Sequence, residues 1–256
     1  MIPQSSQSRL TYCFVPKILT FTCRAGYKDG ATPFATANVS DSFEPGWAAL
    51  NVGLLIERLF MRISHSRHID GLWLGVIDKS DDDLLCRVEE ALLLIKTYDV
   101  IRYEQIRRDV GRIWVCPLPG PRGSFSGALN ACKLDSRFVK SSEPESIAST
   151  IVHEGTHARP CLRKIGYSEP LRHRIERICM MQQLTFLQKV PGGEKASEEV
   201  ERNLAREASD WSDDGLKRLY DDGRDALARD LGIPSWMIRF ALMIRKFRAR
   251  FHPKKR

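Results

Sequence analysis

Apolar residues recur at helical spacing along most of the chain beyond residue 46. Between Trp47 and Met61 they fall on one side of a helix. An acidic turn at Asp81–Asp83 precedes a second apolar run that ends at Ile95, which is typical of an amphipathic helix. A shorter helix is expected over about Val100–Val110. The same spacing predicts further helices over residues 168–190, 197–208, 214–231 and 236–251.

Short stretches without this spacing predict a small sheet. The segment GLWLGVI at 71–77 and the segment Ile113–Cys116 are rich in β-branched and aromatic residues. Leu129–Leu134 is a third candidate strand, and we expect the chain to stay extended from there to Val139. Residues 120–127 are rich in Gly, Pro and Ser and predict a loop. The pattern as a whole favours an α+β fold that is predominantly helical.

The chain divides into three parts by composition. Residues 1–45 are rich in Ser, Thr, Gly and Pro and have no clear period, so we expect a poorly ordered N-terminal segment. Residues 46–232 carry the periodic pattern and predict one metal-binding domain, as argued below. Residues 233–256 predict a basic amphipathic helix and tail, because an apolar stripe begins near Trp236 and basic residues fill the other faces.

The net charge of +8 belongs to this tail. Eight lysines and arginines and no acidic residue lie between Arg239 and Arg256, and without them 32 basic residues face 32 acidic ones. A nucleic-acid-binding surface is therefore not indicated. The segment Trp236–Arg256 is instead a candidate contact for an anionic membrane surface or a protein partner. The simpler alternative is a terminal helix that packs on its own domain.

The cysteines and the apolar runs bear on the compartment. Seven cysteines are scattered without a CxxC pair, which favours a reducing cytoplasm over a disulfide framework. No apolar run reaches the roughly 18–20 residues that span a bilayer. The stretch Leu10–Cys23 faintly resembles a signal peptide, but Pro16 and Lys17 interrupt it. We expect a cytoplasmic protein, with a secreted or membrane-peripheral one as the alternative.

One helix is specified in more detail than the others. Ser142 and Glu145 form an S-x-x-E capping box, and Pro144 falls in the first turn, where proline is favoured. We expect this helix to run from Glu143 and to end before Pro160. The segment HEGTH at 153–157 then lies well inside a capped helix.

The HEGTH segment has the spacing of a metal site. Residues i and i+4 share a helix face, so His153 and His157 can present two imidazoles to one metal ion. Glu154 lies about 100° further round the axis, beside the ion rather than on it. Zinc lowers the pKa of a bound water to about 7, and Glu154 can take the proton of that water as a general base. The alternative is a solvated helix that carries these residues by chance.

The octapeptide IVHEGTHA at 151–158, with the elements around it over about residues 113–190, resembles the zincin metallopeptidases. The resemblance implies a zincin-like domain with a small sheet beside the HEGTH helix, a Zn²⁺ cofactor, and hydrolysis of a peptide or protein substrate. It also implies that substrate lies along the strand that precedes the helix, here Leu129–Leu134. The metzincin extension is absent, since Pro160 and Arg163 replace its glycine and its third histidine.

A catalytic zinc ion typically has three protein ligands. In the gluzincin subgroup of zincins the third is a Glu on a following helix. Glu176 borders the apolar stripe of the next predicted helix, 19 residues beyond His157, and is the favoured candidate. Glu169, 12 residues beyond, is an alternative, although the dipole of the helix start already explains a carboxylate there. A more distant Asp, Glu or His is also possible.

Zincins often place a Tyr, His or Arg near the metal to stabilise the transition state. The resemblance makes Tyr167, Arg172 and His173 candidates for this role. A second reading of the whole site is a zinc-binding or regulatory protein that retains the metal without efficient hydrolysis.

Overall fold

The computed structural model describes residues 47–206, 208–230, 232 and 236, all within one compact unit of the chain, Thr36–Arg256. The predicted N-terminal segment 1–45 lies outside the described residues. So does the predicted basic helix and tail at 233–256, apart from Trp236. Within the described part, no helix is long and apolar enough to cross a membrane.

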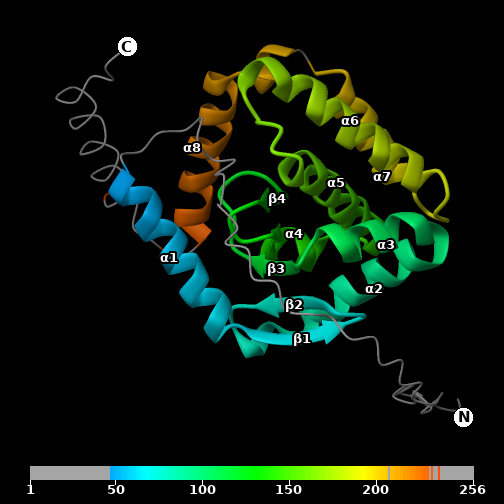
Figure 1. Ribbon diagram of the computed structural model, residues 1–256, viewed down its shortest axis with the longest axis horizontal. Coiled ribbons are helices and arrows are strands. Elements are labelled where there is room, and N and C mark those ends of the chain that lie inside the picture. The colour runs from blue at the N-terminus through cyan, green and yellow to red at the C-terminus, as the bar shows by residue number, and fades with distance from the viewer. Residues whose placement is uncertain (1–46, 207, 231, 233–235, 237–256) are drawn as a thin grey trace, which may run out of the picture. The chain divides into compact units, whose positions relative to one another are not determined.

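Helices account for most of the described residues (Figure 1). They are α1 (Trp47–Ile63), α2 (Asp82–Tyr98), α3 (Val100–Asp109), α4 (Ser136–Ser141), α5 (Pro144–Leu162), α6 (Glu169–Leu187), α7 (Glu194–Leu204) and α8 (Asp213–Asp230), with short 3₁₀ turns at Lys79–Asp81 and Ala208–Trp211. The strands are β1 (His65–Ile69), β2 (Leu72–Val76), β3 (Arg112–Cys116), β4 (Gly123–Ser126) and β5 (Ala131–Asp135).

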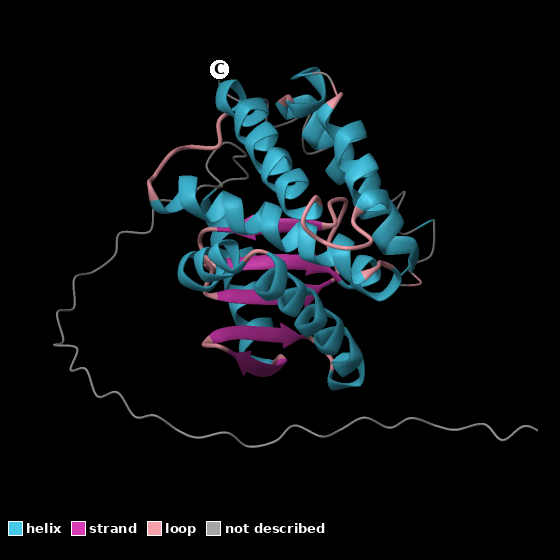
Figure 2. Cartoon of the chain, turned by 90° about the vertical axis from the view of Figure 1, so that its right-hand side faces the viewer, coloured by secondary structure: helices cyan, strands magenta, loops and turns pink. Residues whose placement is uncertain are grey.

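The strands form one mixed sheet in the order β1-β2-β3-β5-β4, seen side by side in Figure 2. Strands β2, β3 and β5 run parallel in the middle, and β1 and β4 are antiparallel at the two edges. Helix α5 packs against β4 and β5. These observations confirm an α+β fold that is predominantly helical and has a small sheet beside the HEGTH helix.

The two faces of the sheet are covered differently. Leu74, Ile113 and Cys132 are aligned on neighbouring strands and pack into the main core with the apolar faces of α2 and α5. Trp73 and Trp114 point to the other face and pack with Met61 of α1. Parallel strands buried on both faces are apolar throughout, which is why β2 and β3 are recognisable in the sequence.

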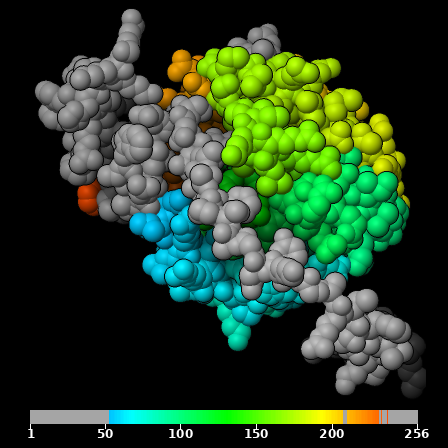
Figure 3. Space-filling view, viewed as in Figure 1, coloured from blue at the N-terminus to red at the C-terminus, as the bar shows by residue number. Residues whose placement is uncertain are grey.

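Helices α3 and α6 are joined by polar contacts at the side of the molecule. Arg102 of α3 donates a hydrogen bond of 2.7 Å to Gln182 of α6, and Lys189 contacts Asp99 at 2.8 Å. In the space-filling view the green surface of α2 and α3 adjoins the yellow surface of α6 and α7 (Figure 3). These contacts fix α6 beside α5, where it carries its part of the site.

Strand β4 lies in the segment that was predicted to be a loop, and that prediction is wrong. Its residues GSFS show no apolar alternation, and they form a strand because their backbone pairs with β5. As a result β5 lies between β3 and β4. The segment Leu129–Leu134 is therefore not an edge strand that could receive substrate, and β4 holds that position instead.

Two further elements differ from the expectations. The chain does not stay extended to Val139, because the side chain of Asp135 accepts a hydrogen bond from the backbone N–H of Arg137 and caps α4. Strand β1 was not predicted, since its sequence HSRHI is mostly polar. The turn Asp70-Gly71 that joins it to β2 has positive φ at both residues, the conformation of a tight hairpin turn.

Helix α5 also differs at both ends from the predicted span. Ser142 is not its N-cap residue: the extended residue Glu143 holds that position, and Ser142 is the C-cap of α4, where its N–H donates to the carbonyl of Phe138. Pro144 occupies the first turn, as predicted. The helix continues through Pro160 to Leu162, since a proline in the last turn removes only one backbone hydrogen bond.

Candidate metal centre

Helix α5 holds the HEGTH residues between the sheet and α6. Ile147, Ile151 and Val152 are fully buried on its core face. The imidazoles of His153 and His157 project on a different side, toward α6, and each keeps 14% of its surface exposed. Helical periodicity therefore separates the residues that anchor the helix from those that face the site.

Helix α6 presents Glu176 to the two imidazoles. Glu176 is 5% exposed, and its neighbours Ile175, Cys179 and Met180 bury this side of α6 against α5. A carboxylate is held at such a position only where polar groups meet it. The polar side chains that contact Glu176 are those of His153, His157 and Tyr167.

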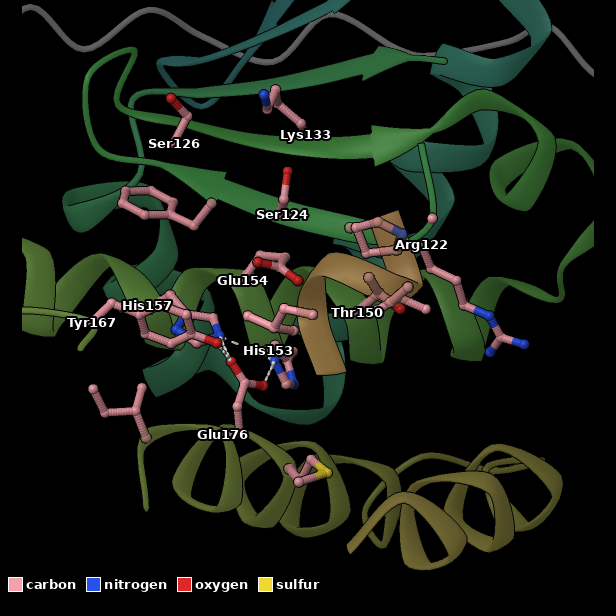
Figure 4. Close-up of a pocket in the computed structure, with 18 of the residues that line it drawn as sticks. Arg122, Ser124, Ser126, Lys133, Thr150, His153, Glu154, His157, Tyr167 and Glu176 are labelled. Carbon is pink, nitrogen blue, oxygen red and sulfur yellow. Dashed lines mark hydrogen bonds and ion pairs between the residues drawn. The ribbon is translucent and has the colours of Figure 1, made fainter. Parts of the chain in front are cut away.

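Three donor atoms converge at one point (Figure 4). The Nε2 atoms of His153 and His157 are 3.1 Å apart, and the carboxylate oxygens of Glu176 lie 3.2 Å from the first and 3.3 Å from the second. In a tetrahedral zinc site with bonds of about 2.0–2.1 Å, neighbouring ligand atoms are about 3.3 Å apart. Oε2 of Glu176 is the oxygen near His153 and Oε1 the one near His157, so the donors of these three residues lie at spacings that a metal ion could bridge.

Hydrogen bonds from outside the triangle orient these donors. Nδ1 of His153 lies 2.8 Å from Oε1 of Gln183, and an amide oxygen there requires the imidazole to donate from Nδ1. When this imidazole loses its second proton, the lone pair of Nε2 is directed into the triangle, as metal-ligating histidines require. The hydroxyl of Tyr167 donates to Oε1 of Glu176, and its ring stands edge-on to His157 at 5.7 Å.

The charges in the triangle depend on one another. Burial alone would raise the pKa of Glu176, but hydrogen bonds to His153 and His157 outweigh it and hold this pKa well below its usual range. Burial alone would lower the pKa of His153, yet the bond to Glu176 and the charges of Glu154 and Glu176 raise it to about 9. In the absence of a metal ion, the negative charge of Glu176 therefore favours the protonated, positively charged form of His153.

Glu154 lies beside the triangle, on the side of β4 (Figure 4). It is 6% exposed, and burial raises its pKa, which the neighbouring histidines counter only in part. A Cβ atom at Gly123 of β4 would come within 3.1 Å of the Glu154 carboxylate and within 2.8 Å of Thr150. Glycine at this position therefore allows the edge strand to approach the carboxylate closely.

Negative charge in this group is not matched by lysine or arginine. Among the described residues, no Lys or Arg forms an ion pair with Glu154 or Glu176. Two buried carboxylates beside two imidazoles leave a deficit of positive charge that a divalent cation would fill. The residues present therefore fit a bound metal ion.

A cleft of about 880 Å³ opens over the centre. Ser124, Ser126 and Lys133 line it from the sheet, and the Nζ atom of Lys133 lies 3.0 Å from Glu57 of α1. Residues of α7 and α8 form the opposite wall. The cleft therefore runs from the triangle past β4 to the face of the sheet covered by α1.

The other predicted site residues occupy different places. Tyr167 lines the cleft and contacts Glu176. Arg172 is 1% exposed and does not itself line the cleft; its guanidinium donates to the carbonyl of Trp211 and to Asp213 and lies 5.2 Å from the ring centre of Tyr167. His173 is not among the cleft-lining residues. Glu169 is exposed and accepts a hydrogen bond from the backbone of Asp213, so it is not at the triangle.

Helix α8 contributes residues that sequence reasoning missed. Tyr220 lines the cleft, and its pKa is raised by burial and then by the charges of Glu154 and Glu176. The helix approaches the loop before β4 so closely that a Cβ at Gly223 would come within 2.3 Å of the backbone of Gly120. No motif in the sequence pointed to this helix, because its contact with the site arises only from tertiary packing.

Cys179 is a further missed candidate. One ligand atom each from His153, His157 and Cys179 lie within 4.8 Å of one another, and this group of side chains can hold a metal ion. The signal available in the sequence was its position three residues after Glu176, one turn further along the same helix.

No protein-family model, no curated protein and no solved structure matches the chain. What the site can do is therefore argued from its own geometry.

Proposed function

We propose that the chain is a zinc-dependent hydrolase of the zincin type and acts as a peptidase. The observation that carries this proposal is the triangle of His153, His157 and Glu176, with donor atoms 3.1–3.3 Å apart and Glu154 beside it. Zinc held by these three residues would supply Lewis acidity, which lowers the pKa of a water and polarises a carbonyl oxygen. The spacing of the donors and the missing positive charge both support zinc.

Glu154 serves as the general base. It takes a proton from the water that attacks the carbonyl carbon of the scissile bond, and it passes this proton to the amine nitrogen as the C–N bond breaks. Burial raises the pKa of Glu154, and a divalent cation beside it would lower that pKa and keep the carboxylate ionised. A loaded centre would therefore favour the ionised form of Glu154 that a general base requires.

Strand β4 is the substrate platform in this proposal. Among the described strands it pairs only with β5, so its outer backbone groups can pair with an extended peptide. Such a peptide would pass between β4 and the triangle, with alternate side chains directed to opposite faces of the sheet. Gly123 lets β4 approach Glu154 closely, so a peptide paired with β4 would lie near this carboxylate.

Two tyrosines have distinct roles. Tyr167 donates to Glu176 and is a positioning residue for that ligand. Tyr220 lines the cleft with its hydroxyl protonated, since burial raises its pKa, and it can donate to the oxygen that gains negative charge in the transition state. Arg172 acts at a distance by holding the chain around Trp211 and Asp213, which leads into α8.

A zinc-binding protein without efficient hydrolysis is the second candidate. The observation that favours it is the thiol of Cys179 near the same imidazoles, because four protein ligands are typical of structural zinc sites.

The variant Glu154→Gln separates the two candidates. In a peptidase it should retain one zinc ion per chain and lose at least about 100-fold in the rate of cleavage of an unfolded protein substrate, since a general base contributes 10²–10⁴-fold. Glu143→Gln, an exposed glutamate just before the same helix, is the matched control and should cleave at the wild-type rate. A zinc-loaded wild type that cleaves no faster than Glu154→Gln would contradict the peptidase proposal.

A further inference from the structure

Glu176 and Cys179 approach the same two imidazoles from one helix. They are three residues apart on α6, so their side chains lie one turn from each other on neighbouring parts of its surface. Cys179 is 1% exposed and packs between α5 and α6. Its sulfur lies within 4.8 Å of a nitrogen of His153 and of a nitrogen of His157.

The two side chains reach the imidazoles from different cavities. Glu176 lines the large cleft, whereas Cys179 lines a second cavity of about 210 Å³ between α3, α5 and α6. A sulfur ligand from that side would leave the cleft side of an ion open to water and substrate. Together with Glu176 this ligand would bring the protein donors to four, the number typical of a structural site, so a water on the cleft side would be a fifth ligand, which catalytic zinc sites can accommodate.

The required movement is small. With zinc–sulfur bonds of about 2.3 Å and zinc–nitrogen bonds of about 2.0–2.1 Å, sulfur and nitrogen ligands are about 3.6 Å apart. From within 4.8 Å, the sulfur would need to move by about 1 Å, which rotation about a single side-chain bond can provide.

We propose that Cys179 is an additional, thiolate ligand of the ion held by His153, His157 and Glu176. This inference rests on the proposed metal centre and specifies its chemistry. A thiolate favours zinc, cobalt and cadmium over magnesium, calcium and manganese. The centre should therefore discriminate against the hard divalent ions that an all-oxygen and imidazole site would tolerate.

Cobalt substitution tests the inference through absorption, without reference to activity. The full chain is loaded with one equivalent of Co²⁺, and a thiolate ligand gives an intense near-ultraviolet sulfur-to-cobalt band. We expect this band in the wild type and its loss in Cys179→Ser and Cys179→Ala, with cobalt affinity lowered about tenfold or more. Cys161→Ser is the matched control, because Cys161 lines the large cleft but is not in the cluster, and it should retain the band.

A second measurement needs no variant and so does not depend on the folding of one. Site-resolved alkylation of the wild type is followed with and without zinc. Zinc should protect Cys179 at least tenfold more than Cys132, a buried thiol outside the cluster that reports only the general stabilisation of the fold. Equal protection of both thiols would overturn the inference.

The two proposals fail in different ways. If the wild type binds one cobalt ion and shows only the weak visible bands, the thiolate assignment is wrong and the metal centre stands. If the wild type binds no cobalt, both the centre and the thiolate assignment are wrong.

Discussion

Two groups of buried carboxylates hold the helices of this protein together, and they differ in how their charge is balanced. In the first group, Asp99 contacts Arg102 and Lys189, and Asp109 contacts Arg108 and Arg159. Each carboxylate is thus paired with two basic side chains of the chain itself. We call Asp99, Asp109 and these four basic residues the matched group.

The second group consists of His153, Glu154, His157 and Glu176. Within the described part of the chain neither of its carboxylates is paired with a lysine or an arginine. The difference is clearest at Glu154: hydrogen bonding to Arg108 lowers the pKa of Asp109, whereas burial raises that of Glu154. Burial acts in the same direction at Glu176, whose pKa is lowered only through its hydrogen bonds to His153 and His157. The matched group is balanced by cations of the chain itself, whereas in the second group the proposed metal ion would supply the positive charge.

The largest expected effect is on metal binding. His157→Ala removes one of the three donors and should lower zinc affinity by more than about 100-fold, because loss of an outer hydrogen-bond partner alone typically costs 10- to 100-fold. Zinc at 100 times its wild-type dissociation constant should stabilise the wild type by about 2.7 kcal/mol and the variant by no more than about 0.4 kcal/mol. Chelator competition and thermal unfolding with and without zinc measure both quantities.

The control for this variant is His173→Ala. This histidine lies on α6 and does not line the cleft, so its removal should leave zinc affinity unchanged. Equal losses in the two variants would show that zinc binds elsewhere.

A substitution in the matched group should lower stability and leave zinc affinity unchanged. Asp109→Asn should lower the free energy of unfolding by about 2 kcal/mol, since it removes charge-assisted bonds to Arg108 and Arg159, and zinc affinity should stay the same. The folded-state pKa of Asp109 lies below 3.8, so this contribution is present above that pH and is lost as the pH falls through the folded value. Denaturant titrations at several pH values test it, and a difference from wild type that grows as the pH falls below 3.8 would contradict this account.

A smaller effect is expected at the edge strand. Gly123→Ala places a methyl group against Thr150 and the Glu154 carboxylate, so β4 or Glu154 must shift by a few tenths of an ångström. We expect about a tenfold loss of hydrolysis with zinc affinity unchanged, since small misplacements of a base cost this much or more. Gly166→Ala, where a Cβ meets nothing within 4 Å, should behave as wild type.

The smallest expected effect is the release of a proton when zinc binds. The pKa of His153 is raised to about 9 in the metal-free protein, so at pH 7.5 zinc must displace a proton from this imidazole. Zinc affinity should therefore increase with pH up to about 9 and then level off. Calorimetry in two buffers of different ionisation enthalpy measures the proton released, and identical heats in both would contradict the predicted protonation.

The helices and buried strands were predictable because their own sequences specify them. Helix α5 and strand β3 have clear apolar periods, and the spacing of His153 and His157 could be read directly from the chain. Glu176 could be proposed as well, because a carboxylate on the border of an apolar stripe requires a partner.

Elements that depend on tertiary contact were missed. Strand β4 exists through its pairing with β5, and Tyr220 reaches the cleft only because Gly223 lets α8 approach Gly120 closely. Neither the pairing of β4 with β5 nor the contact of α8 with Gly120 can be recognised from the local sequence pattern. The same holds for Arg172, which the resemblance to zincins made a candidate near the metal and which instead contacts Trp211, Asp213 and the ring of Tyr167.

The zinc content of the purified chain tests the account most directly. The wild type and the double variant His153→Ala/His157→Ala are dialysed against trace zinc and analysed for bound metal per chain. The account predicts one zinc ion per wild-type chain and none in the double variant. A wild type that retains no more zinc than the double variant would contradict it.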